Sequence, residues 1–497
     1  MKKLSSPLLT CSFTVCGLNL ERFLALMQQE EIPLEDVRRT GRRTLRCQCR
    51  TADFAAVTQI AADKGWRIRE VRPERASAVW SSWKARPGLW VGMALALLML
   101  LALPGCGIKA QALTKDIVPQ ALDTTTDLTA GGEAVSAFAL SLLRSERAGE
   151  TGLLLSPVSI LNALGMTANG AGGTTLKQME TAAGMSLNQL NEFLYTYRMS
   201  LPAAYKSCAV SLANSAWVRD TFRVEDSFLR ACVNYYSAEV YRSAFDGSLV
   251  TDLNRWVGKE TNGLIDSLLE QAPGEATMLY LVNAACFDAR WETPYEASDI
   301  REGGTFTAAS GARQTADYLT GTESIYLSGN NVTGFLKPYD GGKYAFVALL
   351  PDEGVTLEDY LKNLTGEHLY QLITGHQYAD VQASIPRFTA QTELELEKAL
   401  TAMGITDLFD VSRADLRAMG SAPSGNNLYV SSVLHKTYLS LDENGTRAAA
   451  ATSVQVNGGS AQPTDVKTVT LDRPFLYMVV DTHACVPLFM GTVTSME

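Results

Sequence analysis

The chain has 497 residues, more than one compact core normally contains, so we expect at least two folded units. Hydrophobic residues make up 46% and charged residues 19%, which excludes a disordered chain. The net charge of −10 is unevenly divided, because residues 1–88 carry +7 and the rest −17. The nine Cys lack the paired spacing of a zinc site, and their scatter predicts neither a metal centre nor a disulfide framework.

Residues 8–72 alternate between strand-like and helix-like patterns. Strands are expected over residues 9–15 and 66–71, helices over 20–29 and 51–64, and a hairpin over 37–49. The expected inward side chains are Leu20, Phe23, Leu24 and Met27 in the first helix and Ala55, Ala56, Ile60 and Ala61 in the second. We therefore predict a small α+β domain of βαββαβ type within residues 1–88.

An uncharged run, LWVGMALALLMLLALP, begins at Leu89 and ends at Pro104. At about 1.5 Å per residue it is slightly short for a bilayer core of roughly 30 Å. Lys84 and Arg86 precede the run, and positive charge favours the cytoplasmic side of a span. We predict a transmembrane helix over residues 89–105, with residues 1–88 in the cytoplasm and the rest of the chain extracytoplasmic.

Two alternatives to this retained anchor stay open. The run could be a buried core helix, or a signal segment, since Leu103-Pro104-Gly105-Cys106 is similar to a bacterial lipoprotein cleavage site. In the second case Cys106 would carry the lipid, although Pro104 and the long preceding region are unusual for such a signal. Anchor and lipoprotein both tether the following domain to a membrane, through a linker over residues 106–125.

The pattern VCGLNLERFLALMQQEEIPLEDVRR, followed by GWRIREVRP and the apolar run, resembles the start of a known protein family. These are single-span sporulation membrane proteins of spore-forming bacteria, and the resemblance covers about residues 1–105. The family differs beyond the span, so the chain is either a fusion or two reading frames joined in error. The basic excess of residues 1–88 could indicate nucleic-acid contact, but a positively charged cytoplasmic flank explains it, and we expect no nucleic-acid partner.

Residues 126–497 form a second domain, in which long helical stretches precede strand-rich ones. The chain has four His and contains no His-Glu-x-x-His, Gly-x-Ser-x-Gly, phosphate-loop or dinucleotide-binding motif. We therefore expect a protein that is not an enzyme and that uses no cofactor and no metal.

The segment 443–457, ENGTRAAAATSVQVN, has a period of two. Alternate positions from Thr446 to Val456 are small or β-branched, whereas the interleaved ones begin with Arg447 and become polar. This pattern is typical of a strand buried on one face. It continues into residues 458–463, whose composition is typical of an exposed loop. The combination predicts two states, one exposed and one inserted into a sheet.

Glu443-Asn444-Gly445-Thr446, followed by four alanines and Thr452, resembles the reactive-centre-loop hinge of an inhibitory serpin. Further matches lie along residues 126–497: LSPVSI from Leu155, LVNA from Leu281 with Trp291, IPRF from Ile385, His435-Lys436, LDRPF from Leu471 and FMG from Phe489. The resemblance implies the α+β serpin fold, with a large central antiparallel-rich sheet, further sheets, about nine helices and an exposed reactive-centre loop.

The resemblance also implies a monomeric suicide-substrate inhibitor of serine-type, or cysteine, endopeptidases. The cleaved loop would insert into the main sheet and trap the acyl-enzyme, and residues 446–457 would span roughly 40 Å as a strand. The implied hinge residues are Glu443, Gly445, Thr446, Ala448, Ala449, Ala450, Ala451 and Thr452. The implied shutter and breach residues are Ser156, Ser159, Asn283, Trp291 and His435. Considered alone, His435 is equally well explained as a core histidine with satisfied hydrogen bonds.

The specificity of the target protease is indicated only by the small residues around the candidate cleavage site. Counting from the hinge puts the cleaved bond at Gly459-Ser460, and counting back from Leu471 puts it near Pro463-Thr464. The candidate scissile region comprises Val456, Gly458, Gly459, Ser460, Ala461 and Pro463. We expect an elastase-like or subtilisin-like target rather than a trypsin-like one, because no basic residue lies between Arg447 and Lys467.

Two other functions stay open. A non-inhibitory binding protein of the serpin fold is disfavoured, because the inward hinge positions carry no proline or bulky charge. An outer domain that senses proteolysis is favoured by the N-terminal unit but not by the composition of the hinge.

Overall fold

The structure, a computed structural model, divides into two compact units, Met1–Cys106 and Gly107–Glu497. It describes residues 10–30, 32–41, 43–50, 53–73, 108–122, 126–146, 148, 151–201, 208–261, 263, 265, 267–274, 277–422, 427–446 and 466–496. The predicted span 89–105, Cys106 and residues 447–465 lie outside these ranges. Within the described ranges, no helix is both long enough and apolar enough to cross a membrane.

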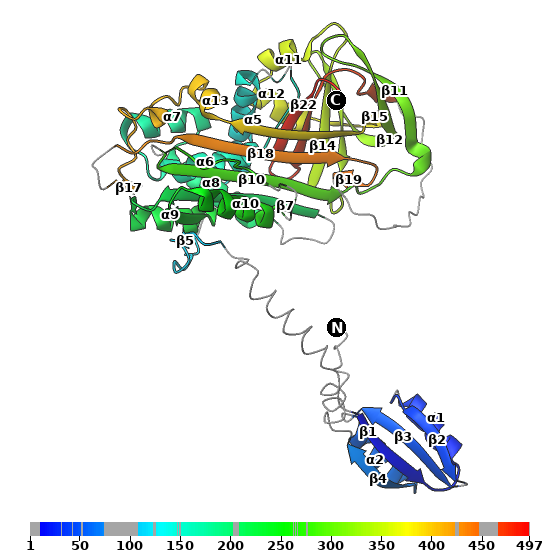
Figure 1. Ribbon diagram of the computed structural model, residues 1–497. Coiled ribbons are helices and arrows are strands. Elements are labelled where there is room, and N and C mark those ends of the chain that lie inside the picture. The colour runs from blue at the N-terminus through cyan, green and yellow to red at the C-terminus, as the bar shows by residue number, and fades with distance from the viewer. Residues whose placement is uncertain are drawn as a thin grey trace. The chain divides into compact units, whose positions relative to one another are not determined.

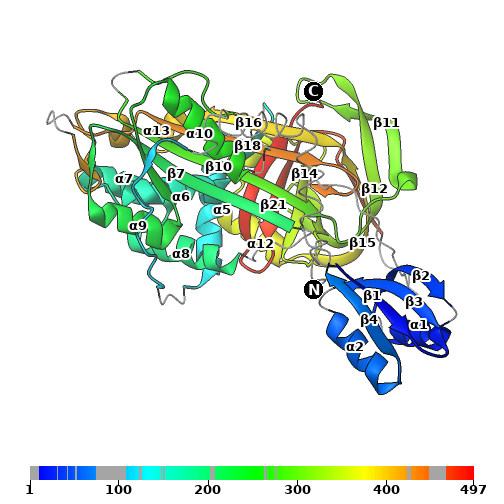
Figure 2. The same cartoon turned by 60° about the horizontal axis from the view of Figure 1, so that its bottom comes forward.

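The first unit is a four-stranded antiparallel sheet with two helices (Figure 1). Its elements are β1 (Thr10–Cys16), α1 (Leu20–Gln29), β2 (Glu35–Gly41), β3 (Thr44–Arg50), α2 (Phe54–Asp63) and β4 (Arg67–Pro73), in the strand order β2-β3-β1-β4. The βαββαβ prediction is thus confirmed. Phe13 and Val15 of the sheet share one apolar core with Phe23 of α1 and Val57 of α2. Both helices therefore cover the same face of the sheet, as Figure 2 shows.

The inward face of α2 agrees with the prediction at Ala61, which is buried, and at Ile60, which is partly buried, and differs at two positions. Ala55 and Ala56 are exposed, and the buried side chains are Val57 and Ala61. The larger Phe54 and Val57 offer more apolar area than two alanines, and their spacing with Ala61 lies on one helical face. In α1, by contrast, Leu20, Phe23 and Met27 are buried as predicted, and Leu24 packs partly buried beside them.

A mixed sheet with the order β16-β18-β19-β10-β7-β9-β5 forms one layer of the second unit. Its strands are β5 (Gln111–Ala112), β7 (Cys208–Arg219), β9 (Glu239–Ser243), β10 (Leu279–Arg290), β16 (Phe388–Glu395), β18 (Ser432–Leu441) and β19 (Gly445–Thr446). The long strands β10 and β18 run parallel, paired from Tyr280↔Ser432 to Cys286↔Tyr438. Further along, the short β19 pairs antiparallel with both strands.

The second large sheet has the order β20-β15-β12-β13-β14-β21-β22-β6, with β11 beside β12. Its strands are β6 (Leu153–Leu155), β11 (Ile300–Thr307), β12 (Arg313–Gly329), β13 (Val332–Pro338), β14 (Tyr344–Pro351), β15 (Gln377–Pro386), β20 (Lys467–Thr470), β21 (Phe475–Asp481) and β22 (Val486–Val493). Strands β14, β21 and β22 are buried throughout, as their continuous apolar sequences require. The small strands β8 (Arg223–Val224) and β17 (Gly420–Ser421) pair separately.

Nine α-helices and two 3₁₀ turns lie in the described part of the second unit, in agreement with the expected number of helices. They are α5 (Leu128–Ser145), α6 (Pro157–Ala168), α7 (Gly173–Ala183), α8 (Leu187–Ser200), α9 (Asp226–Tyr236), α10 (Gly247–Glu260), α11 (Leu357–Asn363), α12 (Gly366–Thr374), α13 (Glu397–Ala402), η1 (Ala297–Asp299) and η2 (Asp407–Phe409). Helix α6 is buried on all sides, between β10 of the mixed sheet and β22 of the other. Ser156 is its N-cap and Pro157 its first residue, a favourable start for a helix.

Residues 108–122, predicted as part of a linker, belong to the second unit and pack against the rest of it. Strand β5 extends the edge of the mixed sheet by pairing with β9. The carboxylate of Asp252 on α10 accepts hydrogen bonds from the N–H groups of Lys109 and Ala110, at 2.8 and 2.7 Å. No local pattern predicted this attachment, because its partners lie more than a hundred residues away in the sequence.

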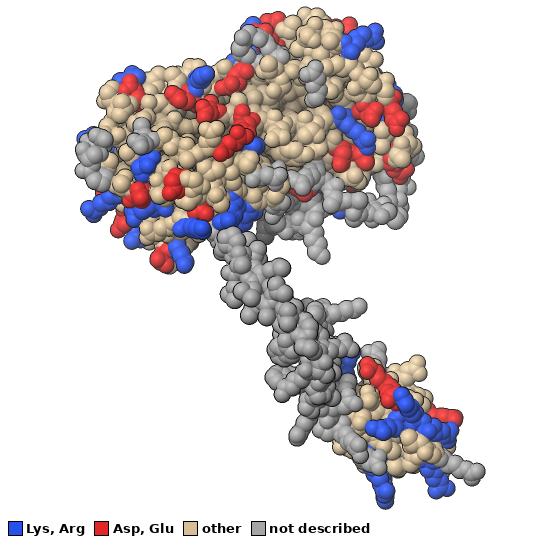
Figure 3. Space-filling model, in the orientation of Figure 1, with Lys and Arg blue, Asp and Glu red and all other residues tan. Residues whose placement is uncertain are grey.

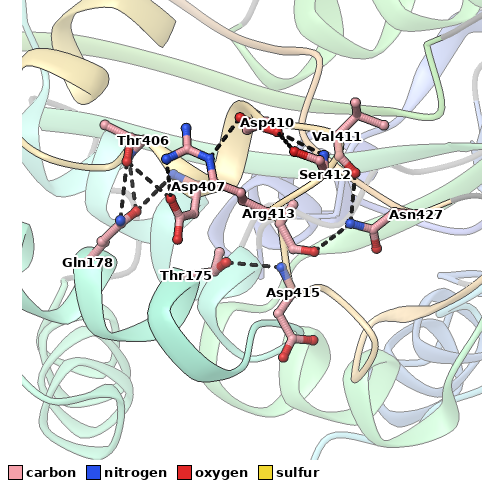
Figure 4. Close-up of polar contacts among 11 residues, drawn as sticks. Thr175, Gln178, Thr406, Asp407, Asp410, Val411, Ser412, Arg413, Asp415 and Asn427 are labelled. Carbon is pink, nitrogen blue, oxygen red and sulfur yellow. Dashed lines mark hydrogen bonds and ion pairs between the residues drawn. The ribbon is translucent and has the colours of Figure 1, made fainter.

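The segment that follows α13 is fastened to α7 by polar contacts (Figure 4). The side-chain oxygen of Gln178 accepts from the N–H groups of Thr406 and Asp407 at 3.0 and 2.9 Å. Arg413 pairs with Asp407 and Asp410 at 3.1 and 2.8 Å. These acidic groups hold a loop together, and the described residues contain no group of three His, Cys, Asp or Glu suited to a metal ion.

Candidate functional site

The predicted hinge begins with a tight turn after β18. The carboxylate of Asp442 accepts from the N–H groups of Asn444 and Gly445 at 2.7 and 3.2 Å, and the chain then reverses into β19. A Cβ atom at Gly445 would lie 2.1 Å from the carbonyl oxygen of Ala289 on β10. Only glycine allows the two backbones to approach this closely, which explains its place in the hinge.

Thr446 enters the mixed sheet between β10 and β18. It pairs with Ala289 on one side and with Leu441 on the other, and its side chain is completely buried. Its hydroxyl lies 2.6 Å from the hydroxyl of Tyr339. The inward orientation predicted for Thr446 is therefore observed, and Thr446 lies between β10 and β18.

Of the remaining predicted hinge residues, the structure describes Glu443 but not those from Ala448 onward. Glu443 forms an ion pair with Arg387, the residue between β15 and β16. The predicted hinge and scissile residues from Ala448 to Pro463 lie outside the described ranges.

Trp291, predicted to lie where insertion begins, directly follows β10 and contacts the hinge backbone. Its indole N–H donates to the carbonyl of Asp442, and its backbone N–H to the carbonyl of Asn444, both at 3.0 Å. The indole stacks on the ring of Tyr339, with centroids 4.5 Å apart. Trp291 therefore contacts the backbone just before Thr446, and Tyr339, stacked on Trp291, contacts the side chain of Thr446.

A buried ion pair lies beside this stack. Lys337 on β13 pairs with Glu323 on β12 at 2.8 Å, and both side chains are almost fully buried. The Lys337 ammonium lies 4.3 Å from the ring centre of Tyr295 and 5.4 Å from that of Trp291. Burial raises the pKa of Glu323, although the charge of Lys337 opposes this shift. We missed Lys337, Glu323 and Tyr339 in the sequence, because only the packing of the second sheet brings them to the hinge.

The predicted shutter residues Ser156, Asn283 and His435 meet beneath the middle of the mixed sheet. The backbone N–H of Ser156 donates to Nε2 of His435 at 3.2 Å, and Nδ1 of His435 lies 2.9 Å from Oδ1 of Asn283. The hydroxyl of Ser156 donates to the carbonyl of Leu488 on β22 at 2.8 Å. All three shutter residues are buried.

Two further residues complete this cluster. Nδ2 of Asn283 donates to the carbonyl of Ser159 and, at 2.7 Å, to Oδ1 of Asn214 on β7. Ser159 thus contributes its backbone, and its hydroxyl has no hydrogen-bond partner among the residues that the structure describes. Asn214 was not predicted; its pairing with Asn283 across β7 and β10 could be recognised only once the strand register was known.

His435 is held in its neutral form. Complete burial lowers the pKa of His435 to about 3, because the imidazolium would lose its hydration. With Nε2 accepting from Ser156, Nδ1 carries the proton and donates to Asn283. The two interpretations of His435 therefore coincide: it is a satisfied core histidine, and it also joins β18 to β10 and α6.

The register of the mixed sheet shows what this site can do. Asn283 and His435 are direct partners in the parallel β10–β18 ladder, so their contact crosses the line along which these strands would separate. A strand that continued β19 along this line would run antiparallel to both neighbours. Insertion would then replace one parallel ladder by two antiparallel ones, which are slightly more stable per residue.

Comparisons with known proteins agree with this geometry. The family model "Serpin (serine protease inhibitor)" matches residues 133–496, and "Putative stage IV sporulation protein YqfD" matches residues 10–105. Neuroserpin from Gallus gallus is 28% identical over 418 residues, covering 81% of this chain and 96% of that protein. The native state of the thermophilic serpin tengpin has a TM-score of 0.73 at 38% identity, covering 78% of this chain and 99% of the other. For the latent state of tengpin the TM-score is 0.65 at 36% identity, with 76% and 100% covered.

Proposed function

Because the chain belongs to the serpin family, we propose that its second unit traps serine-type endopeptidases by inserting its cleaved reactive-centre loop between β10 and β18. The observation that carries this proposal is the burial of Thr446 between these two strands. A chain that continued from Thr446 in the direction of β19 would meet the β10–β18 ladder next, which supports insertion at this place.

The reaction begins as ordinary proteolysis. The nucleophile of the protease attacks the scissile carbonyl, the new amine leaves with a proton, and an ester links the protease to the cleaved loop. Residues after Thr446 then extend β19 between β10 and β18. The attached protease is carried along, and distortion of its active site stops hydrolysis of the ester. The free energy comes from the added ladder and from burial of the small inward side chains.

The hydrogen bonds between β10 and β18 would set the free-energy barrier to insertion of the loop. An inserting strand must break the Asn283–His435 hydrogen bond before the two strands can part. The hydrogen bonds of Trp291 with Asp442 and of Tyr339 with Thr446 would stay intact, and they would hold the hinge where the inserted strand begins. The native state would thus be metastable, with a latch at the shutter and a preformed entry at the hinge.

We propose a target with a shallow primary specificity pocket, elastase-like or subtilisin-like. This rests on the small residues of the candidate scissile region, Val456 to Pro463, and on the absence of basic residues between Arg447 and Lys467. A trypsin-like target would be expected only if cleavage fell outside this region.

The test uses residues 107–497 mixed with elastase, subtilisin and trypsin. We expect a covalent adduct that survives boiling in detergent, with mass spectrometry locating the cut between Val456 and Thr464. We also expect the cleaved protein to unfold at a higher temperature than the intact one. Cleavage without an adduct and without gain in thermal stability would show that the loop does not insert, and would favour a binding or sensing function.

We further propose that residues 89–105 hold the inhibitor unit on the extracytoplasmic side of a membrane, with residues 1–88 in the cytoplasm. The uncharged run, the basic residues Lys84 and Arg86 and the change of net charge from +7 to −17 support this arrangement. Fractionation of cells that produce the full chain tests it. Intact chain in the soluble fraction would contradict both an anchor and lipid attachment at Cys106.

A further inference from the structure

The first unit has one sheet face that its helices do not cover. On β1 and β3 the inward residues are apolar, among them Phe13, Val15 and Leu45, and belong to the core shared with both helices. Because side chains alternate along a strand, the interleaved residues lie on the opposite face. On β1 and β3 these are Ser12, Thr14, Cys16, Thr44, Arg46, Gln48 and Arg50.

Arginines are spread over this second face in two directions. The strand register places Arg38, Arg46 and Arg69 in one row across the sheet, in which Arg46 and Arg69 flank Thr14. Arg67 lies two residues from Arg69 along β4, and Arg50 lies four residues from Arg46 along β3. We call the surface formed by Arg38, Arg46, Arg50, Arg67 and Arg69 the arginine face. All five are exposed, and Figure 3 shows Lys and Arg side chains over this unit.

The positive charge of this face is largely uncompensated. Arg38 pairs with Asp36 on the outermost strand, and Glu35 also lies on that edge. Among the described residues, no ion pair joins an acidic group to Arg46, Arg50, Arg67 or Arg69. At the spacings of this sheet, about 7–13 Å between neighbouring unpaired arginines, like charges repel one another at low ionic strength, so an anionic partner is the complement that this face lacks.

The arrangement favours a planar partner over a linear one. Strands lie about 4.8 Å apart and residues on one face about 6.7 Å apart along a strand, so the arginines form a two-dimensional array. Single-stranded nucleic acid is bound along one line, with aromatic side chains stacked on the bases. The described residues of this face include no aromatic side chain. Guanidinium groups bind phosphate in a bidentate manner, and a membrane surface presents phosphates in a plane.

We propose that the arginine face binds the anionic phosphate headgroups of the membrane in which residues 89–105 are anchored, and so docks the first unit on that surface. The inference rests on the proposed membrane attachment. Residues 74–88 separate β4 from the apolar run and reach at most about 50 Å, so the unit stays close to the bilayer. Each basic residue near an anionic surface strengthens binding roughly fivefold.

The test uses the full chain reconstituted into vesicles of phosphatidylcholine, alone or mixed with phosphatidylglycerol. A fluorescent amino acid replaces Thr44, which lies on the same face as Arg46, and a headgroup-labelled lipid serves as the energy acceptor. We expect energy transfer to rise when phosphatidylglycerol is present and to fall when salt is added. The double variant Arg46→Glu/Arg69→Glu should weaken docking by more than about tenfold.

The matched control reverses the same charge on the helical side, with Arg22→Glu and Lys64→Glu, and should retain docking. Energy transfer that ignores phosphatidylglycerol, or that falls equally in both double variants, would overturn the proposal. Flotation of the chain with the vesicles tests the anchor separately. Flotation only with vesicles that contain phosphatidylglycerol would support docking and contradict the anchor, and flotation with neither vesicle type would overturn both. An oligonucleotide that lowers energy transfer, and whose binding only Arg46→Glu/Arg69→Glu abolishes, would assign the face to nucleic acid instead.

Discussion

Nδ1 of His435 on β18 and Oδ1 of Asn283 on β10 lie 2.9 Å apart, and the two residues are register partners in the parallel ladder. This single hydrogen bond therefore spans the seam that an inserting strand would open. Since Nε2 of His435 accepts from Ser156 at the start of α6, the bond also connects the seam to the helix beneath it.

Acid should lower the stability that the neutral His435 side chain and its hydrogen bonds give to the second unit. The pKa of His435 is about 3 in the folded protein, against roughly 6.5 in an unfolded chain, so protons bind preferentially to the unfolded state. The stabilisation is complete above about pH 6.5 and is lost progressively as the pH falls from there toward 3. We expect the unfolding temperature of residues 107–497 to fall over this range, and His435→Gln to reduce this dependence. His368→Gln, on an exposed position of α12, is the control; an unchanged pH profile in His435→Gln would contradict the assignment.

The hinge position Thr446 should decide between inhibitor and substrate. Thr446→Arg would force a guanidinium into a completely buried position beside Tyr339, so insertion should fail while cleavage continues. We expect covalent complex to fall by more than about tenfold, measured on denaturing gels with the protease found to react. Thr468→Arg makes the same change at an exposed position beyond the loop and should leave trapping intact. Equal trapping by both variants would contradict insertion of the cleaved loop next to Thr446.

Removing one partner of the buried ion pair Lys337–Glu323 should destabilise the fold, whereas removing both should not. Lys337→Met leaves the Glu323 carboxylate buried without its partner and should lower the free energy of unfolding by about 3–5 kcal/mol. The double variant Lys337→Met/Glu323→Leu should recover most of this loss, because no charge then remains buried. Urea unfolding of the single and double variants measures both effects.

An exposed pair on the same unit provides the comparison. Lys362 on α11 pairs with Glu358 one helical turn earlier, at 2.7 Å, and both side chains are well exposed. Lys362→Met should change the free energy of unfolding by less than about 1 kcal/mol. A loss as large as that in Lys337→Met would mean that burial is not what makes the Lys337–Glu323 pair important.

The attachment of residues 108–114 should depend on Asp252. Its buried carboxylate accepts two backbone N–H groups from Lys109 and Ala110, so Asp252→Ala leaves both donors without a partner. We expect a loss of roughly 2–4 kcal/mol in unfolding free energy, with faster hydrogen exchange at β5 and its partner β9. The neighbouring Thr251→Ala, at an exposed position, should leave the exchange of β5 unchanged. Protection of β5 that survives Asp252→Ala would show that strand pairing alone holds the segment.

The local sequence was sufficient to predict which side chains face inward where this depends on the repeat of a single strand or helix. The period of two after Glu443 predicted that Thr446 faces inward, because alternation is a property of the backbone. The helix over Leu20–Gln29 was predicted with its observed ends for a similar reason, since its apolar spacing follows the turn of a helix. On α2, Ala61 and Ile60 face the core as predicted, but Ala55 and Ala56 were predicted wrongly, because the larger Phe54 and Val57 pack there instead.

The amino-acid sequence by itself indicated the serpin family of the second unit, the inward orientation of Thr446 and the grouping of Ser156, Asn283 and His435, which the structure brings into contact. Only the tertiary structure decided that Thr446 is buried between β10 and β18, that its hydroxyl contacts Tyr339 with the Lys337–Glu323 pair nearby, and that residues 108–122 pack on the sheet edge. The physical reason is the range of the interactions. Alternation and helical spacing are set by neighbouring residues, whereas a buried hydroxyl or carboxylate takes its partner from whichever strand or helix the packing of the whole unit brings within hydrogen-bonding distance.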